Sequence, residues 1–283
     1  RGMKLVNRIV VSPMCQYSSV DGVAGDWHLV HLGSRAVGGA ALVMTEATHV
    51  SPEGRITSAC AGMYAVGHVA TWKRIVDFVH RSSRARIGMQ LAHAGRKGSC
   101  AVPSEGGRPL REGGWELLAP SAIPFDEGWP APRAMTRSDM DDVRDQFVRA
   151  ASMAAEADFD IVELHMAHGY LLGTFLSPLT NLRDDAHGGS MERRWRFPLE
   201  VFDAVRAVWP AGRPLSVRIS ASDWKPGGLD SAGRVGLAQV LREHGCDMIV
   251  MGSHGRKGLN RVLLGSQAHN VLNMTSKTVM ICR

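Results

Sequence analysis

The sequence predicts an α/β protein that folds as a (β/α)8-type barrel, the TIM barrel. Three observations predict this class: short apolar runs recur along the chain, helical patterns separate them, and polar or reactive side chains follow five of the runs. Several runs lack strict alternation, which is typical of strands covered on both faces of a parallel sheet. A barrel builds its active site at the C-terminal ends of its strands, whereas a doubly wound sheet gathers ligand groups at one switch point. Polar groups on five strands therefore favour the barrel.

Seven apolar runs are expected to be strands. In chain order they are RIVVSPM (8–14), AALVMTE (40–46), RIGMQLAHAG (86–95), FDIVELHMAH (159–168), LSVRISA (215–221), DMIVMGS (247–253) and TVMIC (278–282). An eighth strand is missing from this count, so we expect a barrel that is open, closed by another chain, or closed by the N-terminal segment. An open edge invites association, so a homo-oligomer is among the expected states.

Helical patterns with apolar residues at three-to-four spacing lie between the runs. They cover residues 68–83, 138–157, 191–209 and 231–245. Ser138 is expected to cap the second of these helices, because acidic residues follow it in the first turn. Gly245 is a typical stop for the last one. The Pro- and Gly-rich stretch at 103–132 is too long for a plain connector and is expected to be a lid or an active-site loop.

Composition limits the classes of function. The chain has 283 residues, no apolar run near the roughly 20 that span a bilayer, and no visible secretory signal. Five scattered cysteines without a CxxC pair predict reduced thiols and a cytoplasmic location. The net charge of +6 is spread among acids, which favours a small anionic ligand and predicts no nucleic-acid binding and no membrane partner. The first residue is not Met, so we expect a fragment, a processed chain or part of a longer polypeptide.

His165 and His168 stand three apart at the end of an apolar run, and Tyr170 follows them. Three roles are open for the histidines: metal ligands, satisfied core residues, or donors to an anion or carbonyl. A catalytic zinc site needs a third protein ligand, and the HxxxH spacing of a helical metal site is absent, so no metal is expected. Two imidazole donors can polarise a carbonyl and stabilise the oxyanion that forms from it. A nearby phenol could then deliver a proton to carbon.

Arg218 lies inside an expected strand, so it needs a partner, either an internal carboxylate or an anionic ligand ring. Gln90 ends the third strand and offers an amide suited to the edge of a heterocycle. Cys15, taken alone, reads as a small buried hydrophobe.

Seven motifs in order make residues 1–247 resemble the old yellow enzyme family. They are NRIVVSPMCQYS, EATHVSPEGRIT, QLAHAGRK, APSAI, ELHMAHGYLLGTFLSPLTNLRDD, GGSMERRWRFPLEVF and SVRISASDW. Members of that family are FMN-dependent ene-reductases on a (β/α)8 barrel. Cys15 and Tyr17 are similar to its thermophilic-like class, and two further stretches resemble the reductase part of bifunctional salicylyl-CoA 5-hydroxylase. The resemblance implies an NAD(P)H oxidoreductase that uses NADPH or NADH to reduce an α,β-unsaturated carbonyl or CoA thioester.

The resemblance also implies roles for individual residues. The residues expected to contact FMN are Pro13, Met14, Cys15, Ala47, Gln90 and Arg218. His165 and His168 would hold the substrate carbonyl, Tyr170 would donate the proton, and Tyr17 would border the substrate.

Residues 248–283 resemble the C-terminal part of a universal stress protein instead. Gly252, Gly255, Gly265 and Ser266 fit that family's phosphate-binding glycine pattern. A flavodoxin-like strand–helix–strand unit is therefore expected to complete the same domain, in place of the units that hold the FMN phosphate. The sequence reads as a chimera. Two alternatives to the reductase remain open: a nucleotide-phosphate module that binds an adenine nucleotide, and an inactive structural chimera.

Overall fold

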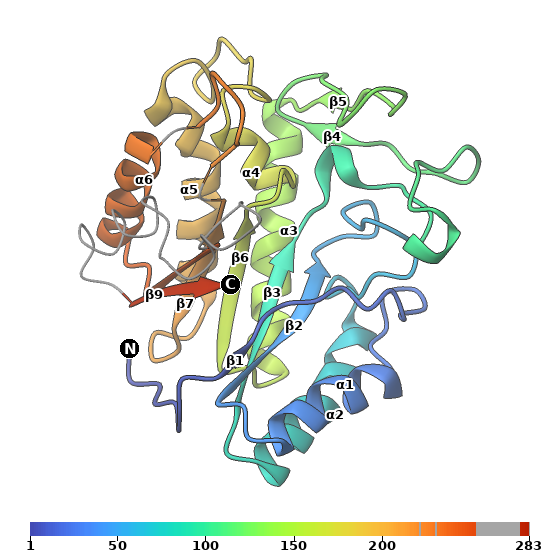
Figure 1. Cartoon of the computed structure of the whole chain (residues 1–283), viewed down its shortest axis with the longest axis vertical. Coiled ribbons are helices and arrows are strands. Elements are labelled where there is room, and N and C mark those ends of the chain that lie inside the picture. The colour runs from blue at the N-terminus through green and yellow to red at the C-terminus, as the bar shows by residue number, and fades with distance from the viewer. Residues whose placement is uncertain (221, 230, 253–277, 283) are drawn as a thin grey trace, which may run out of the picture.

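The computed structural model describes residues 1–220, 222–229, 231–252 and 278–282. Its main feature is one curled, fully parallel sheet in the order β1-β2-β3-β6-β7-β8-β9 (Figure 1). The strands are β1 (Val10–Val11), β2 (Leu42–His49), β3 (Arg86–Ala92), β6 (Ile161–Met166), β7 (Leu215–Ile219), β8 (Met248–Gly252) and β9 (Thr278–Cys282). The α/β class and the count of seven strands are confirmed. Within the described ranges β1 and β9 each pair with one strand, so the sheet is an open half-barrel.

Helices follow the strands and pack against one another in chain order. They are α1 (Asp26–Val37), α2 (Val66–Ser82), α3 (Arg137–Glu156), α4 (Leu171–Leu176), α5 (Met191–Val208) and α6 (Ser231–Glu243). Contacts join α1 to α2, α2 to α3, α3 to α5 and α5 to α6, which makes a helical layer beside the sheet (Figure 1). None of the described helices has the length and apolar character needed to cross a membrane.

The start of α3 differs from the sequence prediction. Thr136, not Ser138, is its N-cap. The Thr136 hydroxyl accepts a hydrogen bond from the Asp139 backbone N–H, and the Asp139 carboxylate accepts one from the Thr136 N–H at 2.7 Å. This reciprocal capping satisfies two helix-end donors at once, which a serine two residues later cannot do.

Alternate residues of the strands face opposite sides of the sheet. One side joins the helices in the main core, to which Met89, Leu91, Val162, Leu164 and Val217 contribute. The other side begins with a small apolar cluster of Leu42, Met44 and Ile161. Gly88 makes room for this cluster, because a Cβ there would lie 2.4 Å from Met44 Sδ and 2.7 Å from Ile161 Cγ2.

Two residues further along each strand, the same inner side turns polar. Gln90 follows Gly88, and Glu163 follows Ile161. A bulge in β2 between Met44 and Ala47 shifts the register so that Ala47 pairs with Gln90. The inner side therefore has an apolar layer near the start of the strands and a polar layer at their C-terminal ends.

Candidate active site

Four neighbouring strands bring five of the inner-side residues together. The register pairs Ala47 with Gln90, Gln90 with Glu163, and His165 with Arg218. All five residues are buried. The four polar ones therefore need hydrogen-bond partners. Two of the predicted residues, Gln90 and Arg218, contact the carboxylate of Glu163, which was not predicted to belong to the site.

Glu163 is the centre of this layer. Its Oε1 accepts a hydrogen bond from Gln90 Nε2 at 2.6 Å and another from Arg218 Nε at 2.9 Å. The side chains of Glu163 and Arg218 are 2% and 10% exposed, so the ion pair is well shielded from water. An internal carboxylate was one of the two partners expected for Arg218, and Glu163 is that carboxylate. Removing one member of such a pair costs about 3–5 kcal/mol, because the other charge stays buried.

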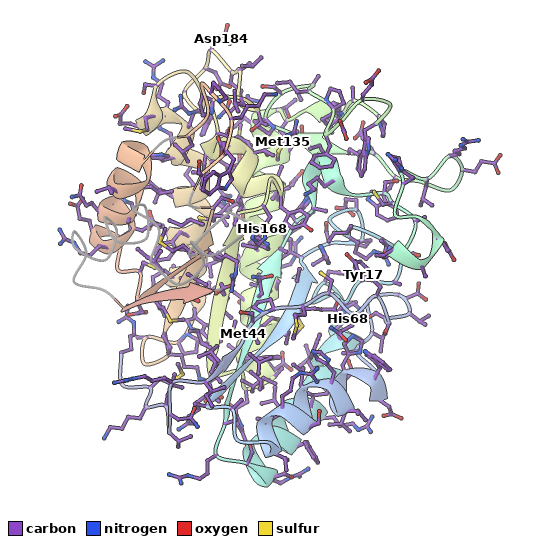
Figure 2. All side chains as sticks on the ribbon, in the orientation of Figure 1. Tyr17, Met44, His68, Met135, His168 and Asp184 are labelled. Atoms are coloured by element: carbon purple, nitrogen blue, oxygen red, sulfur yellow. The ribbon has the colours of Figure 1, made fainter. Side chains whose placement is uncertain are left out.

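The two histidines form a directed chain of hydrogen bonds. The Ala167 backbone N–H donates to Nδ1 of His165 at 3.2 Å, so the proton of the neutral His165 ring lies on Nε2. That Nε2 lies 3.2 Å from Nδ1 of His168 and donates to it. The His168 proton consequently lies on its own Nε2, which faces away from the pair. Figure 2 shows His168 beyond the C-terminal ends of β3 and β6.

Both rings are held neutral. Burial lowers the pKa of His165 well below its usual range, and the nearby His168 and Arg218 lower it further. Partial burial, together with the cations Arg218 and Lys97, also lowers the pKa of His168. At neutral pH each ring is therefore a single N–H donor and one acceptor.

His168 has a left-handed backbone conformation, with φ of +58°, which a non-glycine residue adopts at some cost. Two contacts hold it there. Its N–H donates to Ser220 Oγ at 2.9 Å, and its carbonyl accepts from Lys97 Nζ at 3.1 Å. Tyr170 follows this turn as the N-cap of α4.

Tyr170 stands next to the histidines. Its ring centre is 5.1 Å from that of His165 in an edge-to-face arrangement, and Lys97 Nζ lies 5.0 Å from the Tyr170 ring centre. Burial raises the pKa of Tyr170 above its usual range, so the side chain keeps its proton at neutral pH. The structure thus brings together His165, His168 and Tyr170, as the motif predicted.

The segment after β1 contributes Cys15 and Tyr17 to the same region. Both pack with Tyr170 against a small cluster formed by Ile56, Cys60 and Ala94. Burial raises the pKa of the Cys15 thiol to about 12, and a hydrogen bond joins the Cys15 and Tyr17 side chains. Pro13 is partly buried and Met14 is exposed. Among the described residues, Cys15, Cys60, Cys100 and Cys246 form no disulfide bond.

A buried contact between a histidine and a carboxylate supports this segment. Nε2 of His28, on α1, lies 2.8 Å from Glu46 Oε1, and both side chains are about fully buried. The other oxygen of Glu46 accepts from the Gln16 backbone N–H at 3.1 Å. Glu46 therefore ties α1 and β2 to the chain between Cys15 and Tyr17.

The donor set suits a planar heterocycle. Gln90 Oε1 accepts no hydrogen bond from the described residues, although Gln90 is only 2% exposed. Beside this buried acceptor lies the cation Arg218, and Ala47 adds a small apolar surface. The isoalloxazine ring of FMN carries carbonyl oxygens and an imide N–H along one edge, which match a cation and an acceptor. Of the predicted phosphate loop, Gly252 ends β8, whereas Gly255, Gly265 and Ser266 lie outside the described residues.

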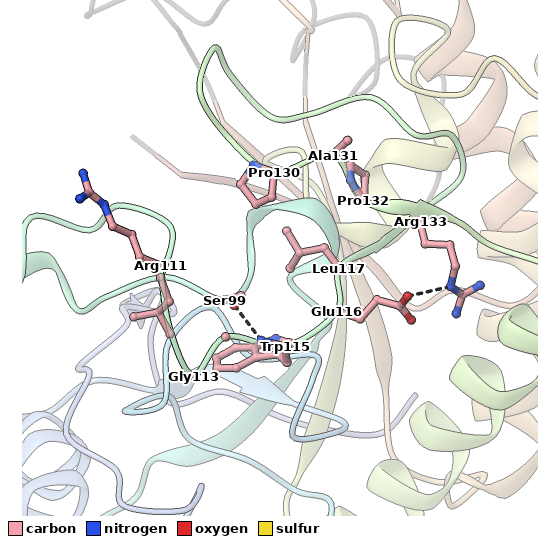
Figure 3. A pocket seen from close by; sticks show the side chains of 12 residues that line it. Ser99, Arg111, Gly113, Trp115, Glu116, Leu117, Pro130, Ala131, Pro132 and Arg133 are labelled. Carbon is pink, nitrogen blue, oxygen red and sulfur yellow. Dashed lines mark hydrogen bonds and ion pairs between the residues drawn. The ribbon is translucent and has the colours of Figure 1, made fainter.

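The stretch at 103–132, which contains β4 (Leu118–Ala119), lines an open pocket of about 560 Å³ together with Ser99 and with Arg133 of β5 (Arg133–Ala134) (Figure 3). Trp115 and Arg111 line it, and an ion pair between Arg133 and Glu116 closes one side. This stretch also reaches the histidine site, since Lys97 Nζ lies 4.5 Å from the centre of the Phe125 ring. A lid role for the stretch stays a prediction.

Sequence reasoning missed Glu163, Lys97 and the His28–Glu46 pair. Two signals could have found Glu163: it is charged within an apolar run, and it precedes His165 by two residues, which places both on one side of a strand. Lys97 follows directly after the end of a strand in the motif QLAHAGRK.

Comparison with known proteins agrees with this geometry. A family model described as the NADH:flavin oxidoreductase / NADH oxidase family matches residues 1–259. The NADPH dehydrogenase of Geobacillus sp. is 45% identical over 255 residues, covering 89% of this chain and 70% of the relative. An NADH:flavin oxidoreductase of Gibberella zeae is 43% identical over 271 residues, covering 90% of this chain and 65% of the relative. This chain therefore spans about two thirds of the length of these relatives.

Solved structures give the same fold. Morphinone reductase superposes with a TM-score of 0.85 at 28% identity, and the match covers 100% of this chain and 77% of that one. Morphinone reductase has also been solved in complex with tetrahydroNAD, at a TM-score of 0.84.

The family match passes Asp247, where the sequence analysis placed a junction, and continues to residue 259. The matches therefore support one family across this point and lend no support to a chimera with a universal stress protein. The barrel class and the FMN-dependent oxidoreductase class predicted from the motifs are confirmed at the level of the family. The chain belongs to the NADH:flavin oxidoreductase / NADH oxidase family, the FMN-dependent NAD(P)H oxidoreductases of the old yellow enzyme type.

Proposed function

We propose that this chain is an ene-reductase that reduces the carbon–carbon double bond of an α,β-unsaturated carbonyl compound or CoA thioester. The observation that carries the proposal is the contact between a neutral histidine pair and a protonated tyrosine at the strand ends. An N–H donor for an oxygen and an O–H donor for a carbon are the two groups that such a reduction requires from a protein.

FMN, when bound and reduced by NADPH or NADH, supplies the hydride. Arg218 and Gln90 would hold its pyrimidine edge, where a cation stabilises the negative charge of the reduced ring. Ala47, Pro13, Met14 and Cys15 would border the rest of the ring. Because burial keeps Cys15 a thiol, it adds a weak donor and no charge beside the ring.

His165 and His168 would bind the carbonyl oxygen of the substrate. A neutral ring gives one N–H, and the His165 N–H is directed at His168 in this structure. Both rings can donate to one oxygen only after this internal bond opens, so the substrate oxygen replaces His168 as the acceptor for His165. The N–H groups then stabilise negative charge that grows on the oxygen as the hydride arrives at the β-carbon.

Tyr170 would deliver the proton to the α-carbon. A raised pKa keeps the phenol protonated in the resting protein. Lys97, whose Nζ lies over the ring, would stabilise the phenolate left after transfer, and solvent would restore the proton. Tyr17, which packs against the same cluster as Tyr170, would border the substrate.

Retention of FMN tests this function. The purified chain is mixed with excess FMN and desalted, and its visible spectrum is recorded. We expect a flavin band that stays with the protein, and less of it with Gln90→Leu, which removes the buried acceptor without leaving a charge. A wild-type chain that retains no flavin at any concentration, while its circular dichroism shows a folded α/β protein, would contradict the proposal.

A second candidate function rests on the C-terminal resemblance, in which Gly252, Gly255, Gly265 and Ser266 bind a nucleotide phosphate. What supports it is that β8 and β9 are parallel neighbours, as the flanking strands of a strand–loop–helix–strand unit must be. This proposal predicts ATP binding that Gly265→Val abolishes. Among the described strands β1 and β9 each pair with one neighbour, which supports the further proposal of a homo-oligomer. That Cys15, Cys60 and Cys100 form no disulfide supports the proposal of a cytoplasmic location.

A further inference from the structure

Glu163 takes part in none of the proposed catalytic steps. It is 1% exposed, lies on the inner side of β6 two residues before His165, and contacts Gln90 and Arg218, the two side chains assigned to the pyrimidine edge of the flavin. One of its oxygens, Oε1, accepts from both of them.

The contact with Gln90 fixes the direction of an amide. A carboxylate oxygen only accepts hydrogen bonds, so the NH2 group of Gln90 must be the end that faces Glu163. The distance of 2.6 Å is short, as is usual when the acceptor is charged. The carbonyl Oε1 of Gln90 is then the end left for a ligand, and no described residue donates to it.

The contact with Arg218 sets a second direction. Nε of Arg218 donates to Glu163, which fixes the plane of the guanidinium group beside the amide. A ligand that meets this pair therefore meets a cation and, next to it, a hydrogen-bond acceptor. Without Glu163, the amide of Gln90 could turn over and present its NH2 group instead.

We propose that Glu163 is a positioning residue that determines which edge of a ring the site accepts: it holds Gln90 so that the carbonyl oxygen meets an N–H donor, and it holds Arg218 beside a carbonyl oxygen. An imide edge, –CO–NH–CO–, fits this arrangement, and an edge whose N–H is replaced does not. The inference rests on the proposed flavin function, because the pyrimidine edge of FMN is such an imide.

The test compares FMN with 3-methyl-FMN, in which a methyl group replaces the imide hydrogen. Dissociation constants are measured from flavin fluorescence, so no turnover is needed. We expect the wild-type chain to bind FMN at least tenfold more tightly than 3-methyl-FMN. Glu163→Met, which accepts no hydrogen bond, is expected to bring this ratio close to one, because the amide of Gln90 can then turn. Glu163→Gln keeps an accepting oxygen and is expected to retain most of the ratio.

A double variant and a control variant distinguish the positioning role of Glu163 from a general loss of structure. Glu163→Met with Arg218→Met removes both members of the ion pair, so no charge is left buried, and its ratio is also expected to approach one. Glu53→Met breaks a similar glutamate–glutamine contact, to Gln146 on α3 at 3.1 Å, and is expected to leave the ratio unchanged. A merely structural role for Glu163 would weaken the binding of both flavins equally and keep their ratio.

Three results would overturn the inference. The first is equal binding of the two flavins by the wild-type chain. The second is a wild-type ratio of the two dissociation constants in Glu163→Met or in the double variant. Both would leave the flavin function intact. Absence of FMN binding by the folded wild-type chain would overturn the inference together with the function on which it rests.

Discussion

Nε2 of His165 donates its proton to Nδ1 of His168 across 3.2 Å, so the two groups assigned to the substrate are bound to each other before a substrate arrives. The backbone N–H of Ala167 fixes the direction of this bond, because it occupies Nδ1 of His165. Substrate binding by both rings must therefore break one internal hydrogen bond, worth roughly 1 kcal/mol.

This relationship predicts how mutations of the two histidines combine. His165→Ala and His168→Ala each remove one donor but also remove the internal bond, so each is expected to lower kcat/KM for an enone by roughly 10- to 100-fold. Each single variant loses one donor but no longer has to open the internal bond. The double variant loses both donors, yet it avoids the cost of opening that bond only once. Its loss should therefore exceed the product of the single losses by about fivefold. A double-mutant cycle on kcat/KM measures this, and a double loss no larger than that product would refute the competition.

Tyr170→Phe is expected to separate the two halves of the reaction. Because Tyr170 donates only to the substrate carbon, reduction of bound flavin by NADPH should keep its wild-type rate. Reoxidation by an enone should slow by roughly 10² to 10⁴, the usual contribution of a general acid. Anaerobic stopped-flow absorbance at the flavin band resolves the two rates. Equal slowing of both would assign Tyr170 to the architecture of the site and not to proton transfer.

The thiol of Cys15 is expected to be unreactive at neutral pH. Burial raises its pKa to about 12, and the thiolate is the form that reacts with alkylating agents. In the folded chain, iodoacetamide at pH 8 should modify Cys15 at least tenfold more slowly than it does in the urea-unfolded chain. Peptide mass spectrometry reads this site separately from the other cysteines. Rapid modification at pH 8 would show that Cys15 is a thiolate and would change the charge beside the flavin.

Acid is expected to destabilise the fold through its buried histidines. Burial lowers the pKa of His93 from 6.5 to about 4, and His49 is lowered to about 3, mainly by burial. The unfolded chain therefore takes up a proton before the folded chain does. The stabilisation from His93 is complete above pH 6.5 and is lost as the pH falls towards 4, at about 1.4 kcal/mol per pH unit.

His93→Gln tests this pH dependence. Glutamine can still accept from the Gly95 N–H, which lies 3.0 Å from His93 Nδ1, but it does not titrate. Urea unfolding at pH 7, 6 and 5 should give a variant that is less stable than wild type at pH 7 and whose free energy of unfolding falls less steeply with acid. Parallel slopes for the two proteins would mean that His93 already carries its proton in the folded state.

The sequence predicted the parts of the site that follow from strand periodicity and motif. His165, His168 and Tyr170 came from the end of one apolar run, and the structure places them in contact. Glu163 lies within that run and was not predicted to belong to the site, yet the two-residue period of a strand puts it on the same side as His165. Only the register between β3, β6 and β7 shows that it meets Gln90 and Arg218.

The sequences at the starts of α1 and α3 explain why the observed helices differ from the predicted ones. α1 was not predicted, because Gly25 caps it without a side chain and three positions, His28, His31 and Gly33, interrupt its apolar pattern. Its start is held by His28, whose Nδ1 accepts from the Gly25 N–H while Nε2 contacts Glu46. The contact with Glu46 is long-range, so no short window of sequence reveals it. Likewise, the cap of α3 lies at Thr136 because Asp139 can reach back to it.

An anaerobic titration shows whether the strand-end cluster carries out a flavin-dependent alkene reduction. The FMN-loaded chain is mixed with NADPH and then with cyclohexenone, while the flavin absorbance is recorded. We expect NADPH to bleach the flavin band, the enone to restore it, and the saturated ketone to appear in equal amount. A bound flavin that NADPH does not bleach, or that the enone leaves reduced, would contradict this function.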